Sequence, residues 1–395
     1  MEKIDAVVNA KVITPYRILD RSGIIIKDGK IVDIMHDGDY SSIQGMNIFD
    51  AKGLYLSPGF IDIHNHGGGG HDYMEGTIDA FLKAALVHLR HGTTSILPTT
   101  AASPGKDLFR MIESFNEAKN VCFPKPRLLG IHIEGPYFNP KQCGAQNVEY
   151  LSYPDREEYL EILDYAKDNV LIWSAAPELP GGMEFGNELR KRGIIASIGH
   201  SDACYNEVVK AFESGYRQVT HLYSGCSMLK RKNSYRYLGV VESAFLIDEM
   251  NVEVIADGCH LPIELLQLIY KVKGPDKVIL VTDSIMAAGM PEGEYILGSR
   301  ESGRPIIVED GVAKLPDRSS FAGSVATADR LIRTMHIGAG LPLHEVVGMM
   351  TVNPARVLGK LGEIGVIAIG AKADFVMFDK NIQIHGVYVE GQRMH

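Results

Sequence analysis

The sequence is poor in cysteine, and its cysteines follow no pairing pattern. There are five, an odd number, and none forms a Cys-x-x-Cys pair. Disulfide-stapled domains and cysteine-based zinc sites depend on evenly paired or closely spaced cysteines, so neither class fits. The 395 residues are enough to bury a large apolar core without such staples.

An excess of positive charge is also missing. The chain has 40 lysines and arginines against 49 aspartates and glutamates, which gives a formal net charge of -9 at pH 7. Without a basic face, nonspecific binding to nucleic acid or to an anionic membrane has no electrostatic driving force. We therefore expect neither partner, although a few local cations would suffice for a small anionic substrate.

Long apolar runs and a targeting signal are absent from the sequence as well. No run approaches the length of a transmembrane helix. The first residues, Met1–Ala6, do not show the basic-then-apolar pattern of a secretion signal. We expect a soluble protein that works in the cytoplasm.

The two ends of the chain share a sequence pattern that is typical of β-strands. Short β-branched runs, separated by glycine and aspartate, fill roughly the first 50 residues, and similar runs return at 375–378 and 385–391. This pattern predicts one small β-sandwich domain built from both termini, residues 1–55 and 360–395. The intervening residues 56–359 would form the catalytic domain.

The middle of the chain alternates short apolar runs with helical stretches. Such alternation predicts a parallel sheet, and eight units over roughly 300 residues favour a closed (β/α)8 barrel over an open doubly wound sheet. No Gly-x-Gly-x-x-Gly follows a first strand, so a dinucleotide-binding fold has no support. The eight runs lie at 59–63, 95–98, 128–134, 171–175, 194–198, 218–221, 252–256 and 278–283.

Polar residues end these apolar runs with unusual regularity. In such barrels, functional side chains gather at the carboxyl ends of the strands. Residues two apart on a strand point to the same side, so His64 and His66 can bind one ion together. A single histidine or aspartate at a strand end is more often a turn or capping residue, but several at matching positions predict a divalent metal site. The residues are His64, His66, Glu134, His200, His221, His260 and Asp283.

Several longer motifs resemble one known family. The chain is similar to the amidohydrolase superfamily and, within it, to the N-acetylglucosamine-6-phosphate deacetylases. The segment His-Ile-Glu-Gly-Pro-Tyr-Phe at 132–138 is the most specific, since it separates the deacetylases from most other amidohydrolases. The other matching segments lie at 58–67, 199–201, 220–223, 256–260, 282–284, 321–324, 351–359 and 370–376.

The resemblance implies a divalent metal cofactor, with one or two ions of zinc, iron or manganese. Glu134, His200 and His221 would hold the principal ion. His64 and His66 would hold a second ion, which Glu134 is able to bridge. Some members of the family lack this first histidine pair and work with one metal.

The resemblance also implies the reaction, which is hydrolysis of the N-acetyl amide of N-acetylglucosamine 6-phosphate to glucosamine 6-phosphate and acetate. Asp283 would be the general base that takes a proton from water and then the acid that protonates the leaving amine. His260 would contact the substrate near the scissile amide. Two alternatives stay open: the same chemistry on N-acetylgalactosamine 6-phosphate or an unphosphorylated amide, and a catalytically silent barrel that acts as a binding protein.

Two segments of the expected substrate site depart from the family pattern. At 144–146 the chain reads Gly-Ala-Gln where the family often has Gly-Ala-His, whose histidine touches substrate. At 224–226 it reads Ser-Gly-Cys where the family has Asn-Ala-Met, whose backbone helps to bind the sugar phosphate. The substrate contacts expected from these segments are Ala145, Gln146, Ser224 and Gly225.

A third departure is the basic segment 230–239. In related enzymes an arginine at this place reaches the phosphate of a neighbouring subunit's substrate. Here the segment is longer, lacks the family's Glu-Pro-Gly, and offers Arg231 and Lys232. The resemblance therefore implies a homodimer that binds an amino sugar phosphate, although a run of charges also fits a solvated face.

Overall fold

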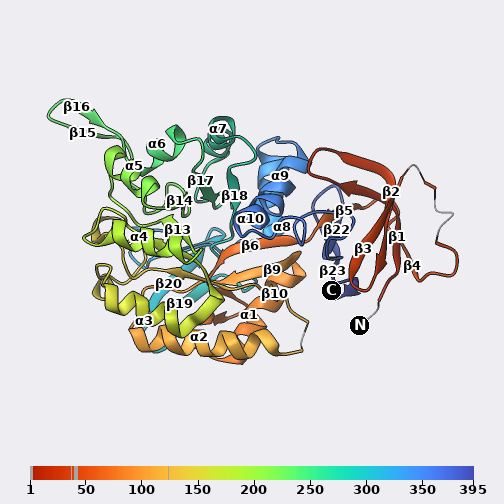
Figure 1. The fold of residues 1–395 in the computed structure, drawn as a ribbon, viewed down its shortest axis with the longest axis horizontal. Coiled ribbons are helices and arrows are strands. Elements are labelled where there is room, and N and C mark those ends of the chain that lie inside the picture. Colours follow the sequence, from red (N-terminus) through yellow and green to blue (C-terminus); the bar gives the residue numbers. More distant parts are fainter. Residues whose placement is uncertain (1–2, 37, 40–42, 123) are drawn as a thin grey trace.

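The computed structural model describes residues 3–36, 38–39, 43–122 and 124–395, and it shows a barrel beside a smaller sheet (Figure 1). The sheet combines strands from both ends of the chain in the order β24-β23-β22-β5-β1-β2-β3, with β4 paired to β1. Because successive side chains of β1 alternate between its faces, Val7 and Val8 enter different apolar clusters. The strands are β1 Ala6–Ile13, β2 Ile18–Lys27, β3 Lys30–Met35, β4 Ile48–Asp50, β5 Tyr55–Pro58, β22 Phe375–Phe378, β23 Ile384–Val389 and β24 Gln392–Arg393.

Strand β5 leads from this sheet directly into the barrel. It pairs with β1 and β22, and β6 begins two residues after its end. The boundary between the two domains at residue 55 stays a prediction, as does the second boundary, at residue 360, where the chain would re-enter the small β-domain.

Eight parallel strands form the barrel, and each coincides with one of the expected apolar runs. Their residues are buried almost without exception, so the strands read as continuous rather than alternating apolar segments. The short strand β10, Arg127–Leu128, extends the pairing of β9. The barrel strands are β6 Phe60–Asn65, β9 Thr93–Pro98, β11 Ile131–Glu134, β12 Val170–Ala175, β13 Ile195–Ile198, β14 Tyr216–Val219, β17 Asn251–Val254 and β18 Val278–Leu280.

The barrel closes at two places where pairing continues past the strand ends. The amide of Asp283 donates to the carbonyl of His64 at 2.9 Å, and the amide of His66 donates to the carbonyl of Ser284 at 2.8 Å. On the other side, the amide of Thr100 donates to the carbonyl of His132 at 3.0 Å. These bonds join the β10-β9-β6 sheet to the β11–β18 sheet, which confirms the predicted (β/α)8 barrel with a small β-domain.

Helices cover the outside of the barrel and bury one apolar face each. For example, α1 starts at Thr77, whose hydroxyl accepts the amide of Ala80 at 3.2 Å. Short 3-10 helices span 73–75, 140–142, 148–150 and 167–169, and 334–338 is a π-helical turn after α8. The α-helices are α1 Ile78–Arg90, α2 Gly105–Asn120, α3 Arg156–Ala166, α4 Gly182–Lys191, α5 Tyr205–Glu213, α6 Val240–Leu246, α7 Ile263–Lys273, α8 Ala328–Arg333, α9 Leu343–Met349 and α10 Val352–Val357.

Three short excursions leave the regular barrel and were not expected from the sequence. A hairpin of β7 Gly67–Gly68 and β8 His71–Asp72 follows β6. A second hairpin, β15 Lys230–Lys232 and β16 Tyr235–Tyr237, projects from the barrel (Figure 1). An antiparallel sheet of β19 Gly293–Leu297, β20 Arg304–Glu309 and β21 Val312–Lys314 is inserted after β18.

The inside of the barrel is apolar at one end and polar at the other. Side chains such as Ile61, Leu97 and Ile172 fill an apolar cluster between the strands. The polar residues follow at the carboxyl ends of the strands, where the functional site of a barrel is expected. None of the helices in the described part of the chain has the length and apolar character needed to cross a membrane.

Candidate metal centre and active-site pocket

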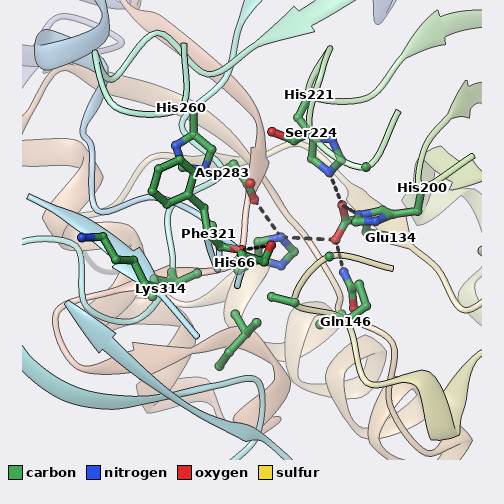
Figure 2. A pocket seen from close by; sticks show the side chains of 18 of the residues that line it. His66, Glu134, Gln146, His200, His221, Ser224, His260, Asp283, Lys314 and Phe321 are labelled. Carbon is green, nitrogen blue, oxygen red and sulfur yellow. Dashed lines mark hydrogen bonds and ion pairs between the residues drawn. The ribbon is translucent and has the colours of Figure 1, made fainter. Parts of the chain in front are cut away.

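The carboxylate of Glu134, at the end of β11, lies at the centre of a buried cluster (Figure 2). Its Oε1 atom is 2.9 Å from Nε2 of His221, 3.3 Å from Nε2 of His200 and 3.5 Å from Nε2 of His64. Its Oε2 atom is 3.5 Å from Nε2 of His66. The carboxylate therefore contacts both groups of histidines that the family resemblance assigned to two ions, with Oε1 facing members of both groups.

Asp283 lies beside the first histidine pair. Its Oδ1 atom is 3.1 Å from Nε2 of His66 and 3.4 Å from Nε2 of His64, and these two nitrogens are 3.3 Å apart. A neutral imidazole has one donor and one acceptor nitrogen, so this crowding of ring nitrogens and carboxylate oxygens fits shared coordination of a cation. The cluster supports a divalent metal site.

Hydrogen bonds on the far ring nitrogens favour the tautomers that a metal requires. Nδ1 of His200 lies 2.8 Å from the carbonyl oxygen of Gln142, which can only accept, so this nitrogen carries the proton. Nδ1 of His64 lies 2.9 Å from Oε2 of Glu253. Each contact leaves the lone pair on Nε2, which faces the cluster, as is usual for metal-binding histidines.

Opposite pKa shifts show that the cluster attracts positive charge. Burial alone would raise the pKa of the Glu134 and Asp283 carboxyls, but the surrounding histidines hold both below their usual range. Burial alone would lower the pKa of His66 and His221, but the same carboxylates raise each to about 9. A bound divalent cation would take the place of these protons.

The backbone turns sharply where three of these side chains enter the site. His200, His221 and Asp283 have φ values of 47°, 28° and 46°, in the left-handed region that residues other than glycine rarely adopt. Each such residue costs roughly 1–3 kcal/mol, a strain that proteins retain mainly at functional sites. The turns direct the three side chains away from their strands and toward Glu134.

A nearby histidine, His132, belongs to the support of the cluster rather than to its ligands. It forms a group with His64 and Glu253 that is compact enough to hold an ion. However, its Nδ1 is 2.9 Å from the carbonyl of Ile63 and its Nε2 is 2.7 Å from the Ser174 hydroxyl, so both ring nitrogens already have partners. Burial lowers the pKa of His132 to about 4, which keeps the ring neutral.

A cavity of about 520 Å³ opens above the metal cluster. His260 lines this cavity. Nδ1 of its ring lies 2.8 Å from Oδ2 of Asp257, and the ring packs on Phe321 with 4.8 Å between the ring centroids. Eleven of the residues selected from the sequence line the cavity or belong to its metal cluster: His64, His66, Glu134, Ala145, Gln146, His200, His221, Ser224, Gly225, His260 and Asp283.

Gln146 lines the cavity but also contacts the cluster. The amide of Ala102 donates to its Oε1 at 2.9 Å, which fixes the side-chain amide so that Nε2 donates to Oε2 of Glu134 at 2.6 Å. The residue that stands where the family often has a histidine therefore orients the central carboxylate.

Arg231 and Lys232 are the two selected residues that the structure does not bring to this cavity. Both lie on β15, in the exposed projecting hairpin, and neither lines the cavity of its own subunit. The lysine and arginine side chains that do line it, among the described residues, are Lys314 and Arg318, which the sequence did not single out. Glu253 was missed as well, because one glutamate between two valines gives no sign of the direction in which it points.

The fold and the site define a metal-dependent hydrolase with a barrel scaffold. Comparison with known proteins supports this class, since residues 55–394 match the Amidohydrolase family. The chain belongs to this family. It is 33% identical over 380 residues to an N-acetylglucosamine-6-phosphate deacetylase of Lysinibacillus sphaericus, which covers 94% of this chain and 93% of the relative. It is 29% identical to an N-acetylgalactosamine-6-phosphate deacetylase of Escherichia coli O157:H7, with 90% of this chain and 92% of the relative covered.

Solved structures of similar proteins share the whole architecture. An aspartate-to-alanine mutant of N-acetyl-D-glucosamine-6-phosphate deacetylase from Mycobacterium smegmatis, in complex with N-acetyl-D-glucosamine 6-phosphate, superimposes with a TM-score of 0.90 at 28% identity, covering 100% of both chains. The deacetylase of Thermotoga maritima gives a TM-score of 0.86 at 28% identity, covering 99% of both chains.

Proposed function

We propose that this protein hydrolyses the N-acetyl amide of N-acetylglucosamine 6-phosphate to glucosamine 6-phosphate and acetate, a step in amino sugar catabolism. The observation that carries the proposal is the placement of Glu134 and Asp283 among four histidines at the floor of one cavity. Relatives and solved structures named for this activity, matched over nearly the whole chain, support the choice of substrate.

The proposed metal ligands are Glu134 and the histidines whose ring nitrogens surround its carboxylate. We assign His200, His221 and Glu134 to one ion, and His64 and His66 to a second ion that Glu134 bridges. Imidazole and carboxylate ligands suit zinc, iron or manganese. A divalent cation supplies a Lewis acid that polarises the amide carbonyl and lowers the pKa of water.

Asp283 would move the proton between the two halves of the reaction. Its carboxylate accepts a proton as the water oxygen adds to the carbonyl carbon. The same proton then goes to the amide nitrogen as the carbon–nitrogen bond breaks and the amine leaves. A positioned carboxylate that first accepts and then donates one proton is a general acid–base catalyst.

The remaining wall of the cavity would position the sugar. His260, oriented by Asp257, would contact the substrate near the scissile amide. The backbone at Ser224 and Gly225, and Ala145 with Gln146, would contact the sugar from the side of His200. Gly225 has a φ of 57° and lies so close to His200 that an added Cβ atom would come within 2.7 Å of its ring, so a larger residue would disturb both.

The projecting hairpin supports a homodimer. Arg231 and Lys232 are exposed on a hairpin that begins a few residues after the cavity-lining Gly225, and the exposed rings of Tyr235 and Tyr237 lie on its other strand. We propose that the hairpin reaches the neighbouring subunit and that its cations approach the substrate there. The cysteines are all free thiols, which agrees with a cytoplasmic location.

The proposed reaction is tested by assaying acetate release from protein loaded with zinc, iron or manganese. Substrates are N-acetylglucosamine 6-phosphate, its galactosamine epimer, and unphosphorylated N-acetylglucosamine. The first should give the highest kcat/KM. Release no greater than that of an Asp283→Asn variant would refute the hydrolase, and a preference for the epimer would reassign the sugar. Protein that binds no metal even after reconstitution would favour a silent barrel.

A further inference from the structure

The side chain of Gln146 is fixed at both ends of its amide group. The residue follows the short helix at 140–142, and only 8% of its surface is exposed. Its Oε1 lies 2.9 Å from the backbone amide of Ala102, which can only donate. This contact decides which end of the side chain is nitrogen. Nε2 therefore faces Glu134 and donates to its Oε2 at 2.6 Å (Figure 2).

The partners of the Glu134 carboxylate are of two kinds, which a metal ion would affect differently. Its histidine partners approach with Nε2, and a ring nitrogen that binds an ion presents a lone pair there instead of a proton. The amide of Gln146 keeps both protons whether or not an ion is bound. Among the carboxylate's contacts in the described part of the chain, the bond from Gln146 is thus the one that donates in every state.

Oε2 of Glu134 has fewer neighbours than Oε1 and depends more on Gln146. Oε1 lies within 3.5 Å of ring nitrogens of His64, His200 and His221. Oε2 has a ring nitrogen of His66 at 3.5 Å and the Gln146 amide. Each carboxylate oxygen has two lone pairs, so Oε2 can accept from Gln146 and still bind an ion. The amide would therefore fix the plane of the carboxylate without blocking its role as a ligand.

Arg304, on the inserted sheet, holds the backbone that carries Gln146. It is the first residue of β20, and its Nη1 donates to the carbonyls of Ala145 and Gln146, both at 3.1 Å. Arg304 is half-buried and does not line the active-site cavity. A planar guanidinium bonded to two successive carbonyls restricts the peptide between them, and with it the direction of the Gln146 side chain. The inserted sheet thus supports the metal centre through the backbone.

We propose that Gln146 is a positioning residue that holds the Glu134 carboxylate in its metal-binding orientation, and that Arg304 acts through Gln146. The inference rests on the proposed function, because that function assigns the metal ligands. It gives Gln146 a role in metal affinity that is separate from any contact with the sugar. Arg304 would have this role from outside the barrel and without contact to metal or substrate.

The test measures metal affinity, without substrate, in three variants of Gln146. Competition with a chelator should show that Gln146→Met, which loses the donor, binds its more weakly held ion about 10–100-fold less tightly. Gln146→Asn keeps the amide but is one CH2 group shorter, so it should behave like Gln146→Met. Gln146→His offers a ring N–H in place of the amide and should lie between. The cobalt-loaded Gln146→Met protein should also have an altered visible spectrum, which loss of a sugar contact alone would not produce.

A double-mutant cycle tests whether Arg304 acts through Gln146. Arg304→Met alone should weaken metal binding about three- to tenfold. In the Gln146→Met background the same change should have less than about a twofold effect, because residues that act as a unit are not additive. The matched control is Gln267→Met, which removes an amide bonded to the carbonyl of Ala339 at 2.9 Å, outside the cavity. This control should keep the metal affinity of the wild type.

Two results would overturn the inference. One is a Gln146→Met protein with wild-type metal affinity and cobalt spectrum and only a raised KM, which would make Gln146 a sugar contact alone. The other is an Arg304→Met effect of full size in the Gln146→Met background, which would exclude action through Gln146. Failure of the proposed function is distinguishable, because a wild-type protein that binds metal but releases no acetate refutes that function and leaves the metal measurements to decide the inference.

Discussion

The carboxylate of Glu253 lies 2.9 Å from Nδ1 of His64, and both side chains are completely buried. Glu253 comes from β17, which is separated from β6, the strand that carries His64, only by β18. Its other oxygen accepts the side-chain amide of Gln218 at 2.6 Å. Glu253 therefore holds the His64 ring in one tautomer and one orientation, with Nε2 directed at the metal cluster.

Glu253→Gln should weaken the His64 and His66 half of the metal centre selectively. Loss of a carboxylate that orients a metal-binding histidine lowers metal affinity about 10–100-fold. Competition with a chelator, followed by elemental analysis, should show two ions per wild-type subunit and about one in the variant. The visible spectrum of the cobalt-loaded protein should lose one component.

The matched control for Glu253 is Glu345→Gln, which removes a carboxylate bonded to Tyr270 far from the cavity. It should leave both ions in place. Equal metal content in Glu253→Gln and the wild type would show that this contact has no role in metal binding.

Asp283→Asn should abolish most of the activity while it preserves the fold. Removal of a general acid–base group lowers kcat by about 10²–10⁴-fold. KM should change little, and the ion held by His200 and His221 should remain, because those residues contact Glu134 rather than Asp283. Steady-state kinetics and elemental analysis check both points. Activity within tenfold of the wild type would exclude Asp283 as the proton carrier.

Asp329 should contribute to stability in a pH-dependent way. Burial alone would raise its pKa, but hydrogen bonds from His91, Thr327 and Arg333 lower it to about 2. A carboxyl with a lowered folded-state pKa stabilises the fold above its unfolded pKa, and this contribution disappears as the pH falls from about 4 to about 2. Asp329→Asn should therefore lower the free energy of unfolding by about 2 kcal/mol at pH 7.

Denaturant unfolding at a series of pH values measures this contribution of Asp329. The difference in the free energy of unfolding between wild type and Asp329→Asn should be constant from pH 7 to pH 5 and should decrease below pH 4. Asp79→Asn, which removes only an exposed pair with Lys83, should change stability by less than about 1 kcal/mol at every pH. If this difference in the free energy of unfolding stays constant down to pH 3, the lowered pKa of Asp329 is not the reason for it.

The barrel could be predicted from the sequence because its strands are buried on both faces. Such strands appear as short apolar runs, and their polar ends carry the ligands within two or three residues of the run. Glu134, His200 and His221 are of this kind. Local sequence patterns therefore predict both the barrel strands and the ligands at their carboxyl ends.

Other parts of the site depend on contacts between distant segments, which local patterns do not report. Glu253 is one polar residue inside an apolar strand, and only the closed barrel brings it to His64. Lys314 ends β21 of the inserted antiparallel sheet and Arg318 lies in the turn that follows, and the alternation of barrel units includes neither segment. The resemblance to related enzymes implied that Arg231 and Lys232 supply the positive charge that binds the substrate's phosphate. Within one subunit, both residues lie on an exposed hairpin.

The hairpin can be tested through mixed dimers, because its proposed action crosses the subunit boundary. Arg231→Ala/Lys232→Ala should raise KM for the phosphorylated sugar about tenfold with kcat unchanged. Mixing the hairpin variant with an excess of Asp283→Asn subunits should restore activity at low substrate concentration. In such a mixed dimer, the intact hairpin of the inactive subunit would reach the active cavity of the hairpin variant. A wild-type protein that sediments as a monomer, or a hairpin variant with normal KM, would contradict a shared site.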